Sequence, residues 1–473
     1  MTLSVAATAQ ATSAGRSPRS RLENLCDESS FRPIRSAVLS GGLGDRAQPG
    51  DGVVAGAGRV GGCPVFCYCQ DPRFLGGSLG GSHADTIVRT MDLAGEAGAP
   101  VVGFVESGGA RLQEGHLALA GYGRIFRASV KLSRRVPQIS VIDGVSAGGG
   151  AYSPALTDFV VMTDAARLFL TGPKVLEKAV GERVSMERLG GPDVHRANGV
   201  CQLSVRDENE AIERVHHLLG LLPARFGSPT PMAEVLDPEI ADPGLTVPVN
   251  PRKTYDVRDT LNGVVDRGSA IEICQGWGPG MYTGLARLGG RTVGIVANQT
   301  RRLGGVIDAE AAEKAAVFVN DCDRFGLPLV VLVDTPGFMP GLRQEQDGVI
   351  RHGASLLKAF AGASVPKLTV VLRKAFGGAA ITMNSRDLGA DVVFAWPGAE
   401  IGIMSAGQAV GIVNRRDLET AADDERQAVV DRYAERHLTA SAAAASGFVD
   451  EVIEPGQTRS SLIWALTMID GRS

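Results

Sequence analysis

The stretch QISVIDGVSAGGG, residues 138–150, decides the fold, because a short apolar run ends there in consecutive glycines. The stretch KLTVVLRKAFGG, residues 367–378, repeats this pattern, and the glycine pair at 148–149 returns 229 positions later at 377–378. A short apolar run that ends in glycines is typical of a buried strand followed by a sharp turn. Two copies at this distance indicate that the chain is internally duplicated.

Other landmarks recur at an offset of 228 or 229: Gly61-Gly62 with Gly289-Gly290, Gly76-Gly77 with Gly304-Gly305, Pro100 with Pro328, and Val136-Pro137 with Val365-Pro366. Each half then reads as strand, glycine pair, amphipathic helix, buried strand, glycine turn, helix, buried strand and glycine pair. The first amphipathic helix is expected over 84–97 in one half and over 309–325 in the other. This alternation predicts an α/β fold with a mostly parallel or mixed sheet.

Prolines mark the join between the halves. Seven of them lie between Leu222 and Tyr255, with few regular apolar repeats, as in a linker. A chain of 473 residues also exceeds the roughly 250 to 300 at which one core stops growing. We therefore expect a disordered tail (1–20), an N-terminal domain (21–225), a proline-rich linker (226–252) and a C-terminal domain (253–473).

Composition excludes several classes of protein. Hydrophobic residues make up 44%, charged residues 21%, and the net charge is −4, which is ordinary for a soluble enzyme and calls for neither nucleic acid nor a membrane. No apolar run approaches the ~18 residues that span a bilayer. The first twenty residues lack the apolar segment of a secretory signal, and a disordered tail is favoured over an Arg- and Ser-rich transit peptide. We expect a cytoplasmic protein.

The cysteines predict neither disulfides nor a metal site. Their number, seven, is odd, and they are scattered over the chain, so we expect reduced thiols. The one cluster, Cys63, Cys67 and Cys69, alternates with apolar residues as in a strand and lacks the paired spacing of a zinc site.

Two motifs suggest other chemistries. Gly56-x-Gly58-x-x-Gly61 matches a dinucleotide-binding fingerprint, but CPVFCYCQ follows it, and this segment is typical of a strand rather than of the required helix, so a hairpin is favoured. No phosphate-binding loop of the G-x-x-x-x-G-K-[ST] type is present, which removes the commonest ATP site.

The motif Gly144-x-Ser146-x-Gly148 matches the nucleophile elbow of serine hydrolases, with Asp158 and His195 downstream. The duplication argues against this hydrolase alternative. Ser146 corresponds to Ala375 in the second half, whereas both glycines of the pair are retained.

What the two halves share is exposed backbone N–H. Glycine has no Cβ, so its backbone adopts unusual conformations and a ligand atom can approach the N–H closely. Such N–H groups form oxyanion holes, in which one donor contributes roughly 2.7 to 4 kcal/mol. Two equivalent glycine pairs favour this functional interpretation over simple close packing.

The same residues resemble a known family, the carboxyltransferase (β) subunits of biotin-dependent acyl-CoA carboxylases. The matching segments follow the family's order from about residue 21 to 453: ESGGARLQEG (106–115), AGGGAYSPALTDFVV (147–161), TGPKVLEKAVGE (171–182), LGGPDVHRANGV (189–200), DTPGFMPG (334–341), RKAFGGA (373–379) and LGADVVFAWPGAEIGIM (388–404).

The resemblance implies tandem ClpP/crotonase-like domains, that is, a duplicated ββα superhelix. The N-terminal domain would hold the CoA thioester and the C-terminal domain biotin. Members of the family are usually homohexamers whose active site lies between the N-domain of one subunit and the C-domain of another.

The resemblance also assigns site residues. Gly148 and Gly149 would donate N–H to the thioester oxygen, and Gly377 and Gly378 would receive the biotin ureido oxygen. The expected cofactor-binding residues are Phe376, Ala379, Gly108 and Gly109.

The implied reaction moves a carboxyl group from N-carboxybiotin to the α-carbon of acetyl-CoA or propionyl-CoA, giving malonyl-CoA or methylmalonyl-CoA. Both developing charges sit on oxygens, so two preorganised N–H sites supply what the reaction needs, and a side-chain base is redundant. His195, Glu345 and His352 are accordingly expected to be structural.

Partners follow from what is missing. The chain has no biotin-acceptor Met-Lys-Met segment and no nucleotide-phosphate loop. A separate biotinylated α subunit is therefore implied, and ATP, Mg²⁺ and bicarbonate enter only through its biotin carboxylase. The same fold would serve a biotin-dependent decarboxylase or transcarboxylase, or a non-catalytic scaffold.

Departures from the family concern specificity. Ile381 occupies a position at which an Asp accompanies propionyl preference in relatives, so an apolar residue there implies use of both acetyl and propionyl groups. Ala380 replaces a bulky ring, which would leave room for a longer acyl chain. Ser405 stands where glycine is usual, and Thr86 replaces a frequent lysine.

Overall fold

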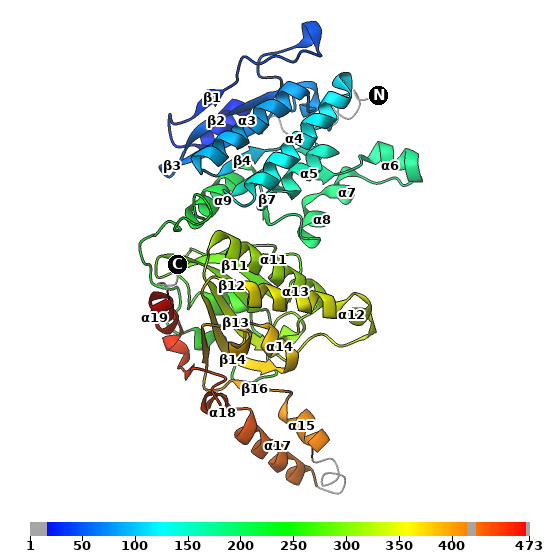
Figure 1. The fold of residues 1–473 in the computed structure, drawn as a ribbon. Coiled ribbons are helices and arrows are strands. Elements are labelled where there is room, and N and C mark those ends of the chain that lie inside the picture. Colours follow the sequence, from blue (N-terminus) through cyan, green and yellow to red (C-terminus); the bar gives the residue numbers. More distant parts are fainter. Residues whose placement is uncertain (1–16, 414–421, 470–473) are drawn as a thin grey trace. The chain divides into compact units, whose positions relative to one another are not determined.

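The computed structural model describes residues 17–413 and 422–469. The chain divides into two compact units, and the boundary along the sequence lies between Thr230 and Pro231. Each unit holds one large mixed sheet with helices packed on it (Figure 1), and the first unit also holds a two-stranded parallel sheet formed by residues 145–147 and 167–169. The division falls within the proline-rich segment at 226–252.

The elements of the first unit are α2 (Pro18–Leu25), β1 (Arg32–Ile34), β2 (Val53–Val60), β3 (Cys63–Gln70), α3 (Gly81–Ala97), β4 (Val101–Phe104), α4 (His116–Leu132), β5 (Gln138–Ile142), β6 (Val145–Ala147), α5 (Gly149–Ala155), β7 (Phe159–Thr163), β8 (Arg167–Phe169), α6 (Pro173–Val180), α7 (Met186–Gly190), α8 (Pro192–Ala197), β9 (Leu203–Val205) and α9 (Glu208–Leu221).

The elements of the second unit are α10 (Val257–Leu261), β10 (Ile271–Glu272), β11 (Met281–Leu288), β12 (Arg291–Asn298), α11 (Ala309–Phe325), β13 (Leu329–Thr335), α12 (Leu342–Gln346), α13 (Val349–Gly362), β14 (Lys367–Phe376), α14 (Gly377–Thr382), β15 (Val392–Ala395), β16 (Glu400–Gly402), α15 (Ala406–Val413), α17 (Asp423–His437), α18 (Ala440–Ala445), β17 (Glu451–Val452) and α19 (Thr458–Ile469).

The two sheets have the same topology. Their strand orders are β1-β2-β3-β4-β5-β7-β9 and β10-β11-β12-β13-β14-β15-β17, each antiparallel over its first three strands and parallel beyond them. Register is preserved as well, since Phe66 pairs with Val101 and Gly294, 228 positions later, pairs with Leu329. The predicted duplication and the α/β class are therefore confirmed.

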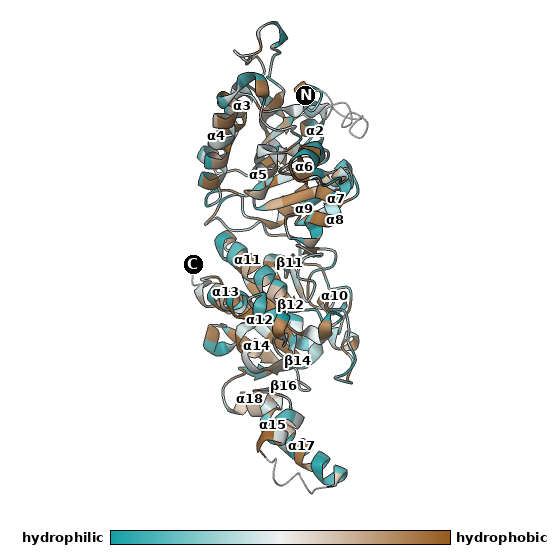
Figure 2. Cartoon of the chain, turned by 90° about the vertical axis from the view of Figure 1, so that its right-hand side faces the viewer, coloured by the Kyte–Doolittle hydropathy of each residue, from teal (hydrophilic) through white to brown (hydrophobic). Residues whose placement is uncertain are grey.

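Helices cover the sheets in the same way in both units, where α3 packs on α4 and α11 packs on α13. Figure 2 shows hydrophilic and hydrophobic residues mixed along these helices, as expected when one face is buried. The predicted helix over 309–325 has exactly the bounds of α11, whereas α3 begins three residues before the predicted start at 84. The earlier start has a long-range cause, because the Glu114 carboxylate accepts the N–H of Gly81 at 2.6 Å.

The glycines of the dinucleotide-like motif lie in a hairpin. Gly56 and Gly58 belong to β2, and the turn to β3 is made by Gly61 and Gly62, which have φ of 56° and 81°. Both turn N–H groups donate to the Asp27 carboxylate, at 2.9 and 2.8 Å. The second unit repeats this turn with Asp266. A strand follows the glycines, so the predicted hairpin is confirmed, and the helix that a dinucleotide-binding fingerprint requires is not found at this motif.

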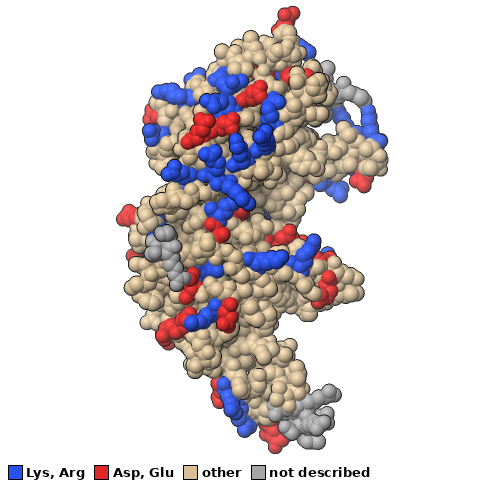
Figure 3. All heavy atoms as spheres, in the orientation of Figure 1, with Lys and Arg blue, Asp and Glu red and all other residues tan. Residues whose placement is uncertain are grey.

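Among the described residues, no helix combines the length and apolar character needed to cross a bilayer, and no group of three or more His, Cys, Asp or Glu side chains is arranged to hold a metal ion. Cys67 and Cys69 are buried in β3, and Cys63 is exposed. Figure 3 shows Lys and Arg interspersed with Asp and Glu over the surface in view.

A buried histidine makes stability depend on pH. His83 in α3 is fully buried, its Nε2 lies 3.2 Å from Gln70 Nε2, and Nδ1 has no hydrogen-bond partner among the described residues. Burial, reinforced by the Arg111 charge, lowers the pKa of His83 to about 3. The unfolded chain takes up this proton below about pH 6.5, but the folded protein does not.

The free energy of unfolding is therefore expected to fall as the pH drops from about 6.5 toward 3, by at most ~1.4 kcal/mol per pH unit from this residue. His83→Gln should remove this contribution, because glutamine does not titrate. Urea unfolding of both proteins at pH 7, 6 and 5 measures the difference in slope, and equal slopes would contradict the assignment.

Candidate active site

The glycine turn of the first unit offers one backbone donor rather than two. Strand β6 ends at Ala147, and Gly148 has φ +59°, a conformation that favours glycine. The Gly148 N–H donates to the Phe169 carbonyl of β8 at 3.1 Å, so it is already engaged. Gly149 is the first residue of α5, where the N–H has no partner within the helix. Of the predicted pair, Gly149 is thus the residue suited to donate to a ligand.

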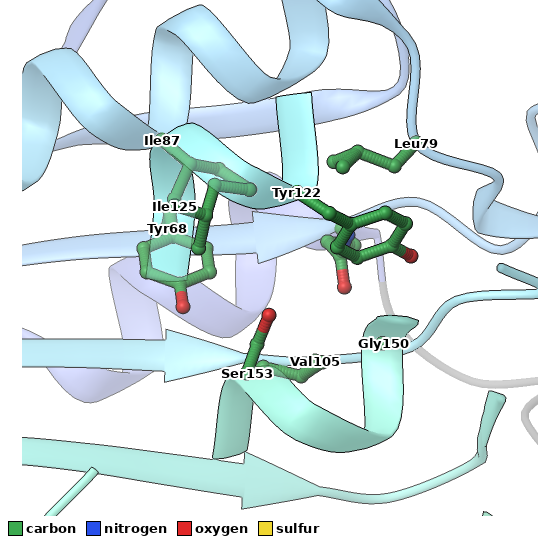
Figure 4. A pocket seen from close by; sticks show the side chains of 9 residues that line it. Tyr68, Leu79, Ile87, Val105, Tyr122, Ile125, Gly150 and Ser153 are labelled. Carbon is green, nitrogen blue, oxygen red and sulfur yellow. The ribbon is translucent and has the colours of Figure 1, made fainter. Parts of the chain in front are cut away.

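A tyrosine ring lies directly against Gly149. A Cβ at this position would lie 2.7 Å from Cδ2 of Tyr122, so only glycine fits. The Tyr122 hydroxyl lies 3.1 Å from Ser107 Oγ, and burial raises the pKa of Tyr122 to about 12. Figure 4 shows Tyr122 and Gly150 together with Ser153 at the recess beneath this turn. The ring therefore connects α5 with the loop after β4.

The loop after β4 lies beside the glycine turn. Ser107 forms a parallel bridge with Ser146, and the Gly109 Cα would lie 3.8 Å from a Cβ on Gly148. The Gly108 N–H donates to Gly76 O at 2.8 Å, and the Gly109 N–H donates to Ser107 Oγ at 3.2 Å. The two glycines predicted to bind the cofactor therefore shape the backbone next to the turn, with both N–H groups engaged.

The second unit contains a more open version of the same turn. Strand β14 ends at Phe376, and Gly377, with φ +59° like Gly148, opens α14. Gly378 is exposed, and no atom lies within 4 Å of a Cβ built on it. The N–H groups at the first positions of α14 have no partner within the helix. A ligand atom can thus approach the backbone here.

The structure separates the remaining predicted residues of this unit into two groups. Phe376 is only 5% exposed and packs with Ala406 and Leu438, and Ala379 is fully buried. Their side chains lie inside the fold, so a contact with a cofactor would have to involve their backbone, and their cofactor-binding role stays a prediction. By contrast, Ile381 is 48% exposed and Ala380 is half-buried, as a specificity surface requires.

Sequence reasoning expected a glycine turn after this strand in both halves, but it gave no role to Thr335 or Gly337 in the turn of the second half. Gly337 lies 228 positions after Gly109, and its N–H donates to Thr335 Oγ1 at 3.3 Å, just as Gly109 donates to Ser107 Oγ. The constant offset was the signal that could have identified Thr335 and Gly337. Both units therefore place a hydroxyl-supported glycine loop after the equivalent strand.

The serine hydrolase alternative is wrong. Ser146 is fully buried, and its Oγ donates to Gly150 O at 2.9 Å. His195 Nε2 lies 2.6 Å from Leu168 O, and the Asp158 carboxylate accepts the N–H of Gln138. Serine, histidine and aspartate therefore form no triad.

Other known proteins share this sequence and fold. The carboxyl transferase domain matches residues 10–472. The chain is 44% identical over 465 residues to the propionyl-CoA carboxylase carboxyltransferase subunit of Haloferax mediterranei, covering 96% of this chain and 90% of that protein. It is also 44% identical over 469 residues to the methylmalonyl-CoA carboxyltransferase 12S subunit of Propionibacterium freudenreichii subsp. shermanii, covering 95% and 88%.

A solved structure agrees over nearly the whole chain. The transcarboxylase 12S hexamer with methylmalonyl-CoA and methylmalonic acid bound gives a TM-score of 0.93 at 42% identity, covering 99% of this chain and 92% of that one. The expected crotonase-like fold is thereby confirmed. Sequence, fold and the repeated glycine turns agree, and the chain belongs to the carboxyl transferase family.

Proposed function

We propose that this protein transfers a carboxyl group from N-carboxybiotin, carried by a partner subunit, to the α-carbon of acetyl-CoA or propionyl-CoA. The observation that carries the proposal is the repeated turn: equivalent positions of both units present backbone N–H beside a glycine loop. A transfer between two carbonyl compounds develops negative charge on two oxygens, and each turn can stabilise one of them.

The first unit is assigned to the thioester. The Gly149 N–H stabilises the thioester oxygen as negative charge develops on it, and Gly109 allows close approach of the backbone on the other side of the turn. Tyr122 holds the donor in place because its ring packs against Gly149 and its hydroxyl contacts Ser107. In this assignment Gly148 sets the turn, and it is not the donor.

The second unit is assigned to biotin. The exposed, unobstructed backbone at Gly378 fits a ureido oxygen, whereas the buried side chains of Phe376 and Ala379 support the turn from below. When bound, carboxybiotin supplies the CO₂ and the base that removes the α-proton. The N–H groups of Gly377 and Gly378 stabilise charge on the ureido oxygen.

Assembly and partners are part of the proposal. The transcarboxylase 12S relative is described as a hexamer, which supports a homohexamer here. The family resemblance implies that the first unit of one chain would face the second unit of another in such an assembly. A biotinylated α subunit would deliver carboxybiotin. From the composition of its first twenty residues, we propose that the protein acts in the cytoplasm.

A decarboxylase or transcarboxylase role is the second candidate, because the transfer is reversible and some relatives bear such names. One is the methylmalonyl-CoA decarboxylase subunit alpha of Veillonella parvula, at 42% identity over 460 residues. The two candidates are distinguished by measuring carboxylation of acetyl-, propionyl- and a longer acyl-CoA, with a biotinylated α subunit, bicarbonate, Mg²⁺ and ATP, and comparing it with the reverse reaction. Activity only in reverse would favour the second candidate.

Ile381 provides a test of acyl-group selection. Its side chain is 48% exposed on α14, next to the proposed biotin site. Ile381→Asp is expected to raise the ratio of kcat/KM for propionyl-CoA over acetyl-CoA about tenfold. This change lies within the range of discrimination that enzymes achieve between substrates differing by one methylene group. Val317→Asp, at a 49% exposed position on α11, is the matched control and should leave the ratio unchanged. An unchanged ratio in Ile381→Asp would remove this assignment.

A further inference from the structure

A buried carboxylate precedes the glycine loop in each unit. Glu106 is 2% exposed and lies immediately before Ser107, and Asp334, fully buried, lies immediately before Thr335 at the equivalent position 228 residues later. The proposed reaction uses backbone N–H groups and gives neither carboxylate a direct role. Desolvation of the charged form raises the pKa of both groups, and a nearby arginine opposes this effect in each case.

Each carboxylate is paired with a buried arginine. In the first unit Arg21 of α2, 4% exposed, donates through Nη1 to Glu106 and through Nη2 to Asp143 at 3.0 Å. In the second unit Arg373 of β14, 7% exposed, donates through Nε to Asp334 at 2.9 Å. A charge is expensive to bury, and both pairs avoid leaving a carboxylate without a partner.

The two arginines do not occupy equivalent positions. The residue that corresponds to Arg373 is Gly144, where a Cβ would lie only 2.2 Å from Glu106 Oε2, so no arginine could extend from that position. Asp27 and Asp266 hold the two hairpin turns in the same way, so α2 of the first unit corresponds to α10 of the second. In this alignment the residue equivalent to Arg21 is Thr260. Each unit thus obtains the same charge pair from a different element.

Stability alone does not account for this repetition, because a buried ion pair is often no more stabilising than an apolar replacement of similar volume. What such a pair supplies is a fixed arrangement of the elements that it joins. Glu106 joins α2 to the loop at 107–109, because its carboxylate is bound by Arg21 of α2 and its backbone leads directly into the loop. The loop is fixed further, since Gly77 packs against the Glu106 carbonyl and Ser107 contacts Tyr122.

Asp334 makes the corresponding connection in the second unit. Its carboxylate accepts the Tyr255 hydroxyl at 3.0 Å and the Lys374 N–H at 3.3 Å, which ties the end of β13 to the end of β14 just before Gly377. Arg373 also donates to three carbonyls of the preceding segment, those of Pro248, Asn250 and Lys253.

We infer that Glu106 with Arg21, and Asp334 with Arg373, are positioning pairs that hold the loops at 107–109 and 335–337 against the two glycine turns. The inference deepens the proposed function and rests on it for the assignment of one loop to the thioester and the other to biotin. All four side chains are at most 7% exposed, so both pairs act through the backbone that they fix.

Hydrogen exchange of the backbone tests the positioning without requiring catalysis. Glu106→Gln keeps the shape of the side chain and removes its charge, and amide exchange at 105–112 is expected to accelerate at least tenfold. Asp266→Asn is the matched control, because Asp266 is also buried and is paired with Arg459 at 2.6 Å but holds a hairpin instead. Equal acceleration at 105–112 in both variants, or none in Glu106→Gln, would overturn the inference.

Kinetics then separate the two loops, using methylmalonyl-CoA and free biotin in the reverse direction. Glu106→Gln is expected to raise KM for the CoA ester and to lower kcat at least tenfold, whereas Asp334→Asn should raise KM for biotin. A merely structural role would change both KM values together or neither. If Glu106→Gln does not fold, the positioning role is tested by the same measurements on two other variants. These are Arg21→Lys, which keeps the positive charge of the pair, and Asp334→Asn.

The two failures can be distinguished. An inactive wild-type protein would count against the proposed function, while hydrogen exchange would still decide whether the carboxylates hold the loops. An active wild type whose loops and KM values do not respond would overturn the positioning role alone.

Discussion

Gly149→Ala is expected to lower kcat for carboxyl transfer about 10²-fold or more, the loss typical of one oxyanion-hole donor. The new Cβ would lie 2.7 to 2.8 Å from three atoms of the Tyr122 ring. The ring cannot easily yield, since it is only 5% exposed and its hydroxyl contacts Ser107. The start of α5 must move instead, and the N–H at position 149 moves with it. Overpacking should also cost about 1 to 3 kcal/mol of stability.

The stability cost requires a control on the same helix pair. Gly123→Ala places a methyl group on the exposed side of α4, where no atom lies within 4 Å. It should leave kcat unchanged and not lower the free energy of unfolding, because alanine is favoured over glycine in a helix. Steady-state kinetics should be run where both variants are fully folded by circular dichroism. A Gly149→Ala protein with wild-type kcat would exclude this N–H as the donor.

Gly378→Ala is expected to lower kcat/KM for biotin about tenfold to 10²-fold while leaving the fold intact. Nothing in the chain lies within 4 Å of the added methyl group, and Gly378 does not have a positive φ. Substitution therefore introduces neither a clash nor backbone strain. The methyl group instead occupies the space through which a ureido oxygen would reach the backbone, so the expected loss is one of binding and catalysis.

The matched control is Gly362→Ala, at the end of α13, where the added methyl group also meets no atom within 4 Å. Both variants should unfold at or slightly above the wild-type temperature, because alanine restricts the unfolded chain. Only Gly378→Ala should lose activity with free biotin. Equal activity in the two variants would mean that biotin does not approach α14 at Gly378.

Much of the fold could be predicted because it depends on local sequence patterns and on their repetition in the two halves. The offset of 228 to 229 located both sheets, and the amphipathic pattern at 309–325 gave α11 its observed bounds. The hairpin at Gly61 and Gly62 followed from the strand-like residues after it. These features depend on residues close together in sequence, where periodicity and turn chemistry act.

The parts that could not be predicted depend on contacts between distant residues. The start of α3 depends on the carboxylate of Glu114, which lies 33 positions from Gly81. The Gly148 N–H donates to Phe169, a residue of β8, and the sequence series of strands and glycine pairs did not include this strand. The pairing of Arg21 with Glu106 spans 85 positions. The burial of Ala379 likewise follows from packing that no local pattern reveals.

The measurement that tests the central claim most directly is the loss of the carboxyl group from methylmalonyl-CoA with and without free biotin, followed by chromatography of the CoA esters. The proposed function predicts propionyl-CoA that accumulates only when biotin is present and in proportion to its concentration. Formation of free CoA by thioester hydrolysis, or propionyl-CoA at the same rate without biotin, would contradict it.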